Sequence, residues 1–109
     1  MKAILKKSDA TEPFTFAFLD GDGKSLVRSE NYKAKSSATN GIESVKKNCD
    51  DNNRYELKEA KNGKLFFNLK SSNGQVVATS AMFDDDAARD AAIALLKAEG
   101  PSAEVDDQT

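Results

Sequence analysis

The side chains that enzymes most often use for proton transfer and nucleophilic attack are scarce in this chain. It contains one cysteine, Cys49, and no histidine. Histidine is the commonest general base and the commonest transition-metal ligand, so catalytic triads and metal sites built on it are excluded. A lone cysteine also excludes an internal disulfide and suits a reducing compartment.

Cys49 is a candidate for a nucleophilic or redox thiol. A reactive thiolate needs a pKa depressed by neighbouring positive charge or by a helix N-terminus. Cys49 instead falls at the C-terminus of a predicted helix, directly before Asp50 and Asp51, where both effects oppose the thiolate. It also continues the apolar stripe of that helix. We therefore expect Cys49 to be a small core or boundary residue.

Two acidic segments have oxygen ligands that calcium or magnesium could use. Asp20–Gly23 is similar to the start of a calcium loop, but the fifth and twelfth positions, which need ligands, are Lys24 and Asn31. The run Asp84–Asp86 lies at a predicted helix start, where consecutive side chains diverge. We interpret the first segment as a hairpin turn and the second as a helix cap, and we expect no metal and no cofactor.

The overall charge argues against a phosphate-backbone partner. The chain has 16 basic and 18 acidic residues, a net charge of −2, whereas nucleic-acid-binding domains usually carry a clear basic excess. No glycine-rich loop leads into a helix, so no phosphate cradle is expected. The longest apolar runs, such as Ala91–Leu96, are too short to span a membrane. The apolar patch near Met1 is shorter than a secretory signal requires, which favours the cytoplasm.

The chain contains an internal duplication. Shifted by 51 residues, Phe14–Cys49 aligns with Leu65–Gly100 without a gap. The identical pairs are Phe16/Phe67, Gly23/Gly74, Ser29/Ser80, Ile42/Ile93 and Lys46/Lys97. No acid recurs at one position in both copies, which weakens the case for paired catalytic carboxylates. Each copy is short for an independent domain, so we predict one domain of two repeats, about 1–53 and 54–105, with 106–109 a frayed tail.

Each copy carries the pattern of a β-hairpin preceded by another strand. Large side chains alternate in Phe14–Phe18 and in Leu65–Leu69, as in strands with one buried face. Asp-Gly and Asn-Gly turns follow at matched positions. The return strands are predicted at about Ser25–Ser29 and Gln75–Ser80, and the preceding strands at Ala3–Lys7 and Arg54–Glu59.

A helix is predicted after each hairpin. In the first copy Ala38, Ile42, Val45 and Cys49 recur at helical spacing, and Ala87–Ala98 has high helix propensity in the second. We expect Ser36 and Ser37 to cap the first helix and Gly100-Pro101 to end the second. Val105 either anchors a short final strand or belongs to the frayed tail.

These elements predict an α+β fold in which tandem β-β-β-α(-β) repeats form one antiparallel sheet with two helices packed on one face. The other face would meet water. Phe66, Asn68 and Lys70 would point to that open face from the second copy. Phe66 is the candidate ligand contact, because an aromatic on an open sheet can stack on a partner. The alternative is that Phe66 packs across strands.

Several segments resemble the YegP-like family of small, mostly bacterial proteins. They are Ser29–Ala38, Asn40–Asn48, Asn62–Lys64, Phe67–Lys70 and Asn73–Val76. The resemblance implies a β-β-β-α-β unit, present as a tandem pair or as a dimer of single units, that forms one continuous sheet. It supplies no catalytic residues. The second copy departs from the family pattern at Ala81, which replaces an acid, and at Ala92, where the first copy has Gly41, so the two copies need not be functionally equivalent.

We therefore expect a cytoplasmic monomer that acts as a non-enzymatic binding module and engages a protein or peptide through an open sheet face or strand edge. Weak nucleic-acid or nucleotide binding through the same face, near Lys58 and Lys70, is the alternative. A small-molecule enzyme is the third possibility and would require a pocket with a perturbed carboxylate or lysine.

Overall fold

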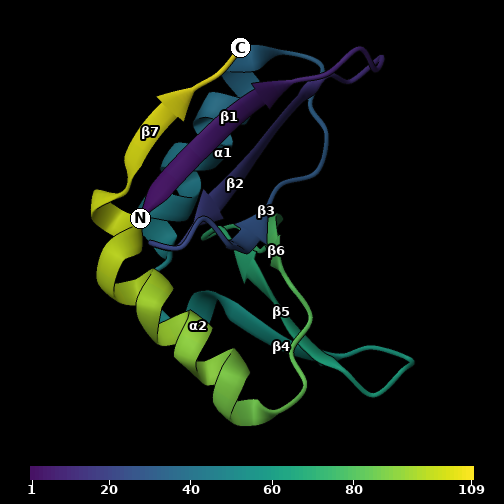
Figure 1. Cartoon of the computed structure of the whole chain (residues 1–109). Helices are drawn as coiled ribbons and strands as arrows, with labels where there is room; N and C mark the ends of the chain where they lie inside the picture. Colours follow the sequence, from purple (N-terminus) through teal and green to yellow (C-terminus); the bar gives the residue numbers. More distant parts are fainter.

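The computed structural model describes residues 1–109 and contains one seven-stranded sheet with two helices packed on one face (Figure 1). The first repeat contributes β1 (Lys2–Lys7), β2 (Phe14–Leu19), β3 (Ser25–Arg28) and α1 (Lys35–Asn48). The second contributes β4 (Tyr55–Glu59), β5 (Leu65–Lys70), β6 (Val76–Ser80), α2 (Asp86–Glu99) and β7 (Glu104–Asp107). Single 3₁₀ turns, η1 (Asn52–Arg54) and η2 (Gly100–Ser102), follow the helices. Neither helix is long and apolar enough to cross a membrane.

The strand order is β4-β5-β6-β3-β2-β1-β7, so the two repeats meet where β6 pairs with β3. Every pairing is antiparallel except β1 with β7, which is parallel. The prediction of a wholly antiparallel sheet is wrong at this pairing, because α2 carries the chain back to the end of the sheet at which β1 begins. There the Glu104 amide donates to the Met1 carbonyl at 3.1 Å. A helical crossover is the usual way to reach a parallel partner.

The C-terminal segment is ordered into the sheet. Val105 does lie in a final strand, and β7 also includes Asp106 and Asp107. The Gln108 amide donates to the Leu5 carbonyl at 2.8 Å. The prediction of a frayed tail is therefore wrong for at least residues 106–107, since backbone pairing with β1 compensates for the polar composition.

Two of the identical pairs, Phe16/Phe67 and Ser29/Ser80, have the same structural task in each copy. The Phe16 amide donates to Ser29 Oγ at 2.9 Å, and the Phe67 amide donates to Ser80 Oγ at 2.9 Å. Each serine hydroxyl thus replaces a strand carbonyl where the chain leaves the sheet. The two phenylalanines belong to one buried cluster of 16 side chains drawn from both repeats, which confirms a shared core.

The helix starts agree only in part with the sequence patterns. Asp85 caps α2, because its side chain accepts a hydrogen bond from the Ala88 amide at 2.8 Å. α1 begins at Lys35 with Ala34 in the capping position and no side-chain cap. Ser36 and Ser37 therefore lie inside the first turn of α1, and the prediction that they cap it is wrong.

Gly41 allows α1 to approach β2 closely. A Cβ at this position would lie 2.6 Å from Phe16 Cε2 and 3.2 Å from the Tyr32 hydroxyl. The second copy has Ala92 at the position equivalent to Gly41, and there Phe83, without a hydroxyl, replaces Tyr32. The missing hydroxyl removes one of the close contacts that a Cβ meets in the first copy, whereas the phenylalanine is retained as Phe67.

We predict that Gly41→Ala lowers the free energy of unfolding by about 1–2 kcal/mol, because overpacking costs more than the gain in helix propensity. Gly21→Ala is the matched control, since a Cβ there meets nothing within 4 Å; it should change the stability by less than about 0.5 kcal/mol. Urea denaturation measures both. Equal stabilities of the two variants would contradict the close approach.

Candidate functional site

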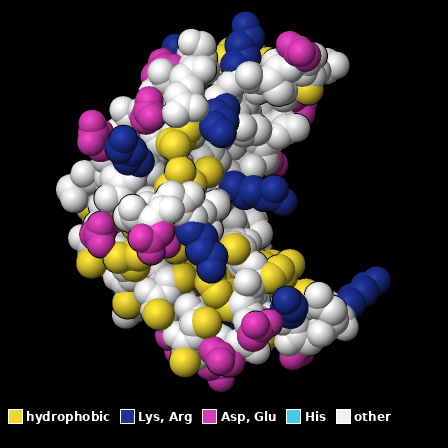
Figure 2. All heavy atoms as spheres, in the orientation of Figure 1, with side chains coloured by type: hydrophobic (Ala, Val, Ile, Leu, Met, Phe, Trp, Pro, Cys, Tyr) yellow, Lys and Arg dark blue, Asp and Glu magenta, His cyan; other side chains and the backbone are white.

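The sheet face that the helices leave uncovered is hollowed (Figure 2). Strand pairing defines its members, because residues directly opposite each other on neighbouring strands share a face. We call this surface the concave face. Its side chains on β1 to β6 are Lys2, Ile4, Lys6, Thr15, Ala17, Leu19, Ser25, Arg28, Glu56, Lys58, Phe66, Asn68, Lys70, Val76 and Thr79.

In the second repeat, the concave face carries a polar network centred on Glu56. Its carboxylate accepts hydrogen bonds from Lys70 Nζ at 2.9 Å and from Asn68 Nδ2 at 3.1 Å. Lys58 Nζ lies 3.9 Å from the same carboxylate, and the Thr79 hydroxyl donates to Asn68 Oδ1 at 2.9 Å. These hydrogen bonds, first from Lys70 and then from Asn68, hold the pKa of the Glu56 carboxyl below its usual range. Glu56 therefore orients the amide and the ammonium group.

In the first repeat, the concave face is apolar at its centre. Ile4, Ala17 and Leu19 line a hollow of about 190 Å³, and Lys6 and Arg28 stand at its border. None of these three apolar side chains belongs to the core cluster or packs against it. The two halves of the face therefore differ in chemistry although their backbones correspond.

Arg28 occupies the centre of the concave face. It lies on β3, opposite Ala17 on one side and Thr79 on the other, where the repeats join. It lines the apolar hollow and also a second hollow of about 330 Å³ beside Ser80 and Met82. An exposed guanidinium at this position can reach an anionic group held in either hollow.

The concave face is basic in a chain that is acidic overall. On β1 to β6 it carries five basic side chains, at Lys2, Lys6, Arg28, Lys58 and Lys70, and one acid, Glu56. Two further acids, Glu104 and Asp106, share the face at its β7 edge. Five bases against three acids give this surface a charge of +2, whereas the whole chain has −2. Figure 2 shows basic side chains reaching toward the hollow.

The three site residues predicted from the sequence lie together on β5. Phe66, Asn68 and Lys70 all face the concave side, while Phe67 and Leu69 between them are buried. Phe66 is half-buried and lies outside the core cluster. Asn68 and Lys70 share the Glu56 carboxylate, but no direct polar contact joins Phe66 to them.

Sequence reasoning missed Glu56, Thr79 and Arg28 as members of this surface. The first two follow from period-two alternation in the strands that flank β5, read across from Asn68. The face on which Arg28 lies could not be assigned from the sequence, because β3 contains a bulge. Leu26 and Val27 are both buried, so strict alternation fails there. No local pattern in the sequence marks that irregularity.

The other groups that the sequence offered as candidates have the surroundings of residues with a structural role. Cys49 is fully buried, and burial, followed by the negative charge of Asp50, raises the pKa of its thiol to about 11. The Asp20 carboxylate accepts from the amides of Asp22 and Lys24, both at 2.9 Å, as in a tight turn. No group of three or more Asp, Glu or Cys side chains lies close enough together to hold a metal ion.

We predict that Cys49 is inert in the folded protein, because its thiol is buried and its pKa lies far above neutral pH. At pH 8 an aromatic disulfide reagent should label less than about a tenth of the protein under native conditions, and all of it in 6 M guanidinium chloride. Absorbance of the released thiolate measures the labelling. Fast stoichiometric labelling of the native protein would contradict the buried thiol.

Comparison with known proteins places the chain in a family. The model of a family described as a domain of unknown function, DUF1508, matches it twice, at residues 9–56 and 60–107. The UPF0339 protein YegP of Escherichia coli K12 is 42% identical over 106 residues, which cover 97% of this chain and 94% of the relative. A UPF0339 protein of Acinetobacter baylyi is 46% identical over 96 residues, covering 88% and 86% of the two chains.

Two solution NMR structures have the same fold. That of a UPF0339 protein from Shewanella oneidensis superimposes with a TM-score of 0.90 at 40% identity and covers 97% of this chain and 89% of its own. That of YegP from Escherichia coli gives 0.90 at 41% identity, covering 99% and 92%. Both structures match the single sheet that the two repeats of this chain form. The chain belongs to the YegP-like UPF0339 family, as a tandem pair of DUF1508 repeats.

Proposed function

We propose that this protein is a non-enzymatic binding module that holds an extended, acidic segment of another protein on its concave face. The observation that carries the proposal is the basic excess around an uncovered apolar hollow. Ile4, Ala17 and Leu19 offer apolar contact, and Arg28 and Lys6 border it with positive charge. An acidic segment with an apolar anchor complements both features.

The second repeat provides the polar half of the site. Glu56 holds Asn68 and Lys70 in place before a partner binds. Each side chain therefore loses less rotamer freedom on binding than an unrestrained side chain would. Phe66 adds an apolar surface on the same strand. Side chains that are already oriented reduce the entropic cost of association, which favours specific recognition over non-specific attraction.

The proposal also covers location and assembly. We propose a cytoplasmic monomer, because the duplication supplies within one chain the two halves of a sheet that single-repeat relatives would have to obtain by dimerising. The lone buried thiol of Cys49 suits a reducing compartment.

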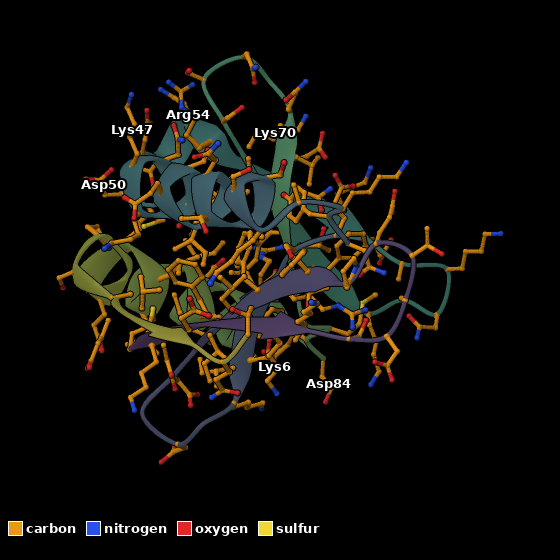
Figure 3. All side chains as sticks on the ribbon, turned by 90° about the horizontal axis from the view of Figure 1, so that it is seen from above. Lys6, Lys47, Asp50, Arg54, Lys70 and Asp84 are labelled. Carbon is orange, nitrogen blue, oxygen red and sulfur yellow. The ribbon has the colours of Figure 1, made fainter.

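We predict that Phe66→Ala abolishes partner capture while leaving the fold intact. Phe66 lies outside the core, so the free energy of unfolding should fall by no more than about 1 kcal/mol. The measurement is affinity capture from the lysate of the native host, followed by mass spectrometry, with wild type and variant side by side. Arg28→Glu should also lose the partner, whereas Lys47→Glu, at the end of α1 (Figure 3), should keep it. Loss of folding in Phe66→Ala, or equal capture of the partner by wild type and Phe66→Ala, would contradict the proposal.

Nucleic-acid or nucleotide binding through the same face is a second candidate, favoured by the position of Lys58 and Lys70 beside Phe66 and Asn68 on β4 and β5. Two features favour a protein partner over it. Phe66 is the only aromatic on the concave face, whereas single-strand binders stack successive bases. Both lysines also lie within 4 Å of the Glu56 carboxylate, at 3.9 and 2.9 Å, which neutralises part of their charge.

If a nucleic acid is the ligand, fluorescence anisotropy with a labelled single strand should show affinity that falls steeply with salt, and Lys58→Glu or Lys70→Glu should weaken it about tenfold. We expect no saturable binding of the strand at 150 mM salt. Saturable, salt-sensitive binding that both variants weaken would replace the protein-partner proposal with the second candidate.

A further inference from the structure

The edge strand β4 corresponds by internal symmetry to β1, but only β1 has a partner on its outer side. Leu5 on β1 lies opposite Phe16, and Leu57 on β4 lies opposite Phe67. β7 pairs with the outer edge of β1, whereas β4 is the last strand of the sheet (Figure 1). The reason is connectivity: the chain that leaves α1 becomes β4 itself, so no segment remains to cover it.

The missing neighbour leaves an apolar trough between β4 and α2. Leu57 is 52% exposed, whereas the equivalent Leu5, beside β7, is 2% exposed. The trough has a volume of about 340 Å³ and its apolar lining consists of Tyr55, Leu57, Ile93 and Ala94. In the first repeat the positions equivalent to Tyr55, Leu57 and Ile93 are Ala3, Leu5 and Ile42, and all three are buried.

Electrostatics at the helix starts distinguish the two edges. In the first repeat Lys35, the first residue of α1, pairs with Asp107 of β7 at 2.7 Å. The equivalent residue of α2 is Asp86, next to Asp84 and Asp85, with Asp90 one turn further on. Nearby bases are Arg89, which contacts Asp86 and Asp90, and Lys64, which contacts Asp84. Four acids against two bases leave the start of α2 negative; Asp90 lines the trough itself, and Lys97, about two turns further along α2, lines it as well.

We propose that β4 is a strand-addition site for an extended, basic segment of another protein. The segment runs parallel to β4, as β7 runs beside β1, and places an apolar side chain in the trough. It carries Lys or Arg at the end nearest Asp86, where β7 carries Asp107 beside Lys35. Main-chain pairing supplies the affinity and the trough and acids supply the specificity. A second copy of β7 does not fit, because its Asp107, which pairs with Lys35 in the first repeat, would meet the acidic start of α2.

This site is separate from the concave face, and its test uses the chain's own β7 as the probe. Two synthetic peptides have the sequence of residues 101–109, one unmodified and one with Asp107→Lys. Each is titrated into the isotope-labelled protein and followed by amide shifts and fluorescence anisotropy. We expect the Asp107→Lys peptide to shift amides of β4 and α2 and to bind about fivefold tighter than the unmodified peptide. In the Asp86→Lys protein the preference should reverse.

Three further variants locate the bound peptide. Leu57→Lys should weaken binding about tenfold, because the apolar contact in the trough is lost. Met82→Lys is the matched control, since Met82 is also 52% exposed but lies on the loop after β6; it should bind like wild type. Phe66→Ala should also bind like wild type, so that failure of the concave-face proposal leaves this result intact.

Four results would overturn the proposal. They are the absence of shifts at β4, equal affinity for the two peptides, loss of peptide binding in Phe66→Ala, and dimerisation of the free protein that Leu57→Lys abolishes in sedimentation experiments. The last would show that a second copy of this chain is the occupant of β4.

Discussion

The pairing of β3 with β6 is the constraint on which the rest of the structure depends. It is short, with Val27 opposite Ser80 and Arg28 opposite Thr79, and the Ala81 amide adds a hydrogen bond to the Leu26 carbonyl at 3.3 Å. This pairing converts two half-sheets into one sheet with a common core. It also places Arg28 at the centre of the concave face and moves the two free edges to β4 and β7.

The helices reinforce this junction on the opposite face. The end of α1 meets the turn after α2, where a Cβ on Gly100 would lie 2.6 Å from Cys49 Sγ. Two short domains of this size would be marginal alone, so burying Cys49 and Leu96 in one cluster stabilises both repeats together. The thiol thus serves packing, and its high pKa follows from the same burial.

Duplication preserved the scaffold and changed the surface chemistry. The paired residues Ser29 and Ser80 keep the same hydrogen bond, whereas the concave face has Leu19 in one copy and Lys70 in the other. The edges diverged similarly, from Lys35 at the start of α1 to Asp86 at the start of α2. Divergence of this kind on a conserved frame suits a protein that recognises an asymmetric ligand with its two halves.

Local patterns predicted most of the fold, and non-local pairing accounts for what they missed. Alternation in β2 and β5 predicted the uncovered face and placed Phe66, Asn68 and Lys70 on it. The parallel partner of β1 was not predictable, since it depends on where α2 delivers the chain about a hundred residues later. Arg28 was missed because a bulge breaks the alternation of β3, and Glu56 was missed because its partners lie on another strand.

The claim that the concave face is the binding surface is tested most directly by photo-crosslinking in living host cells. A photoreactive residue at position 68, on β5, would be compared with one at position 91, exposed on α2. We expect a discrete crosslinked protein from position 68 and none from position 91. Crosslinks of equal yield from both positions, or from position 91 alone, would contradict it.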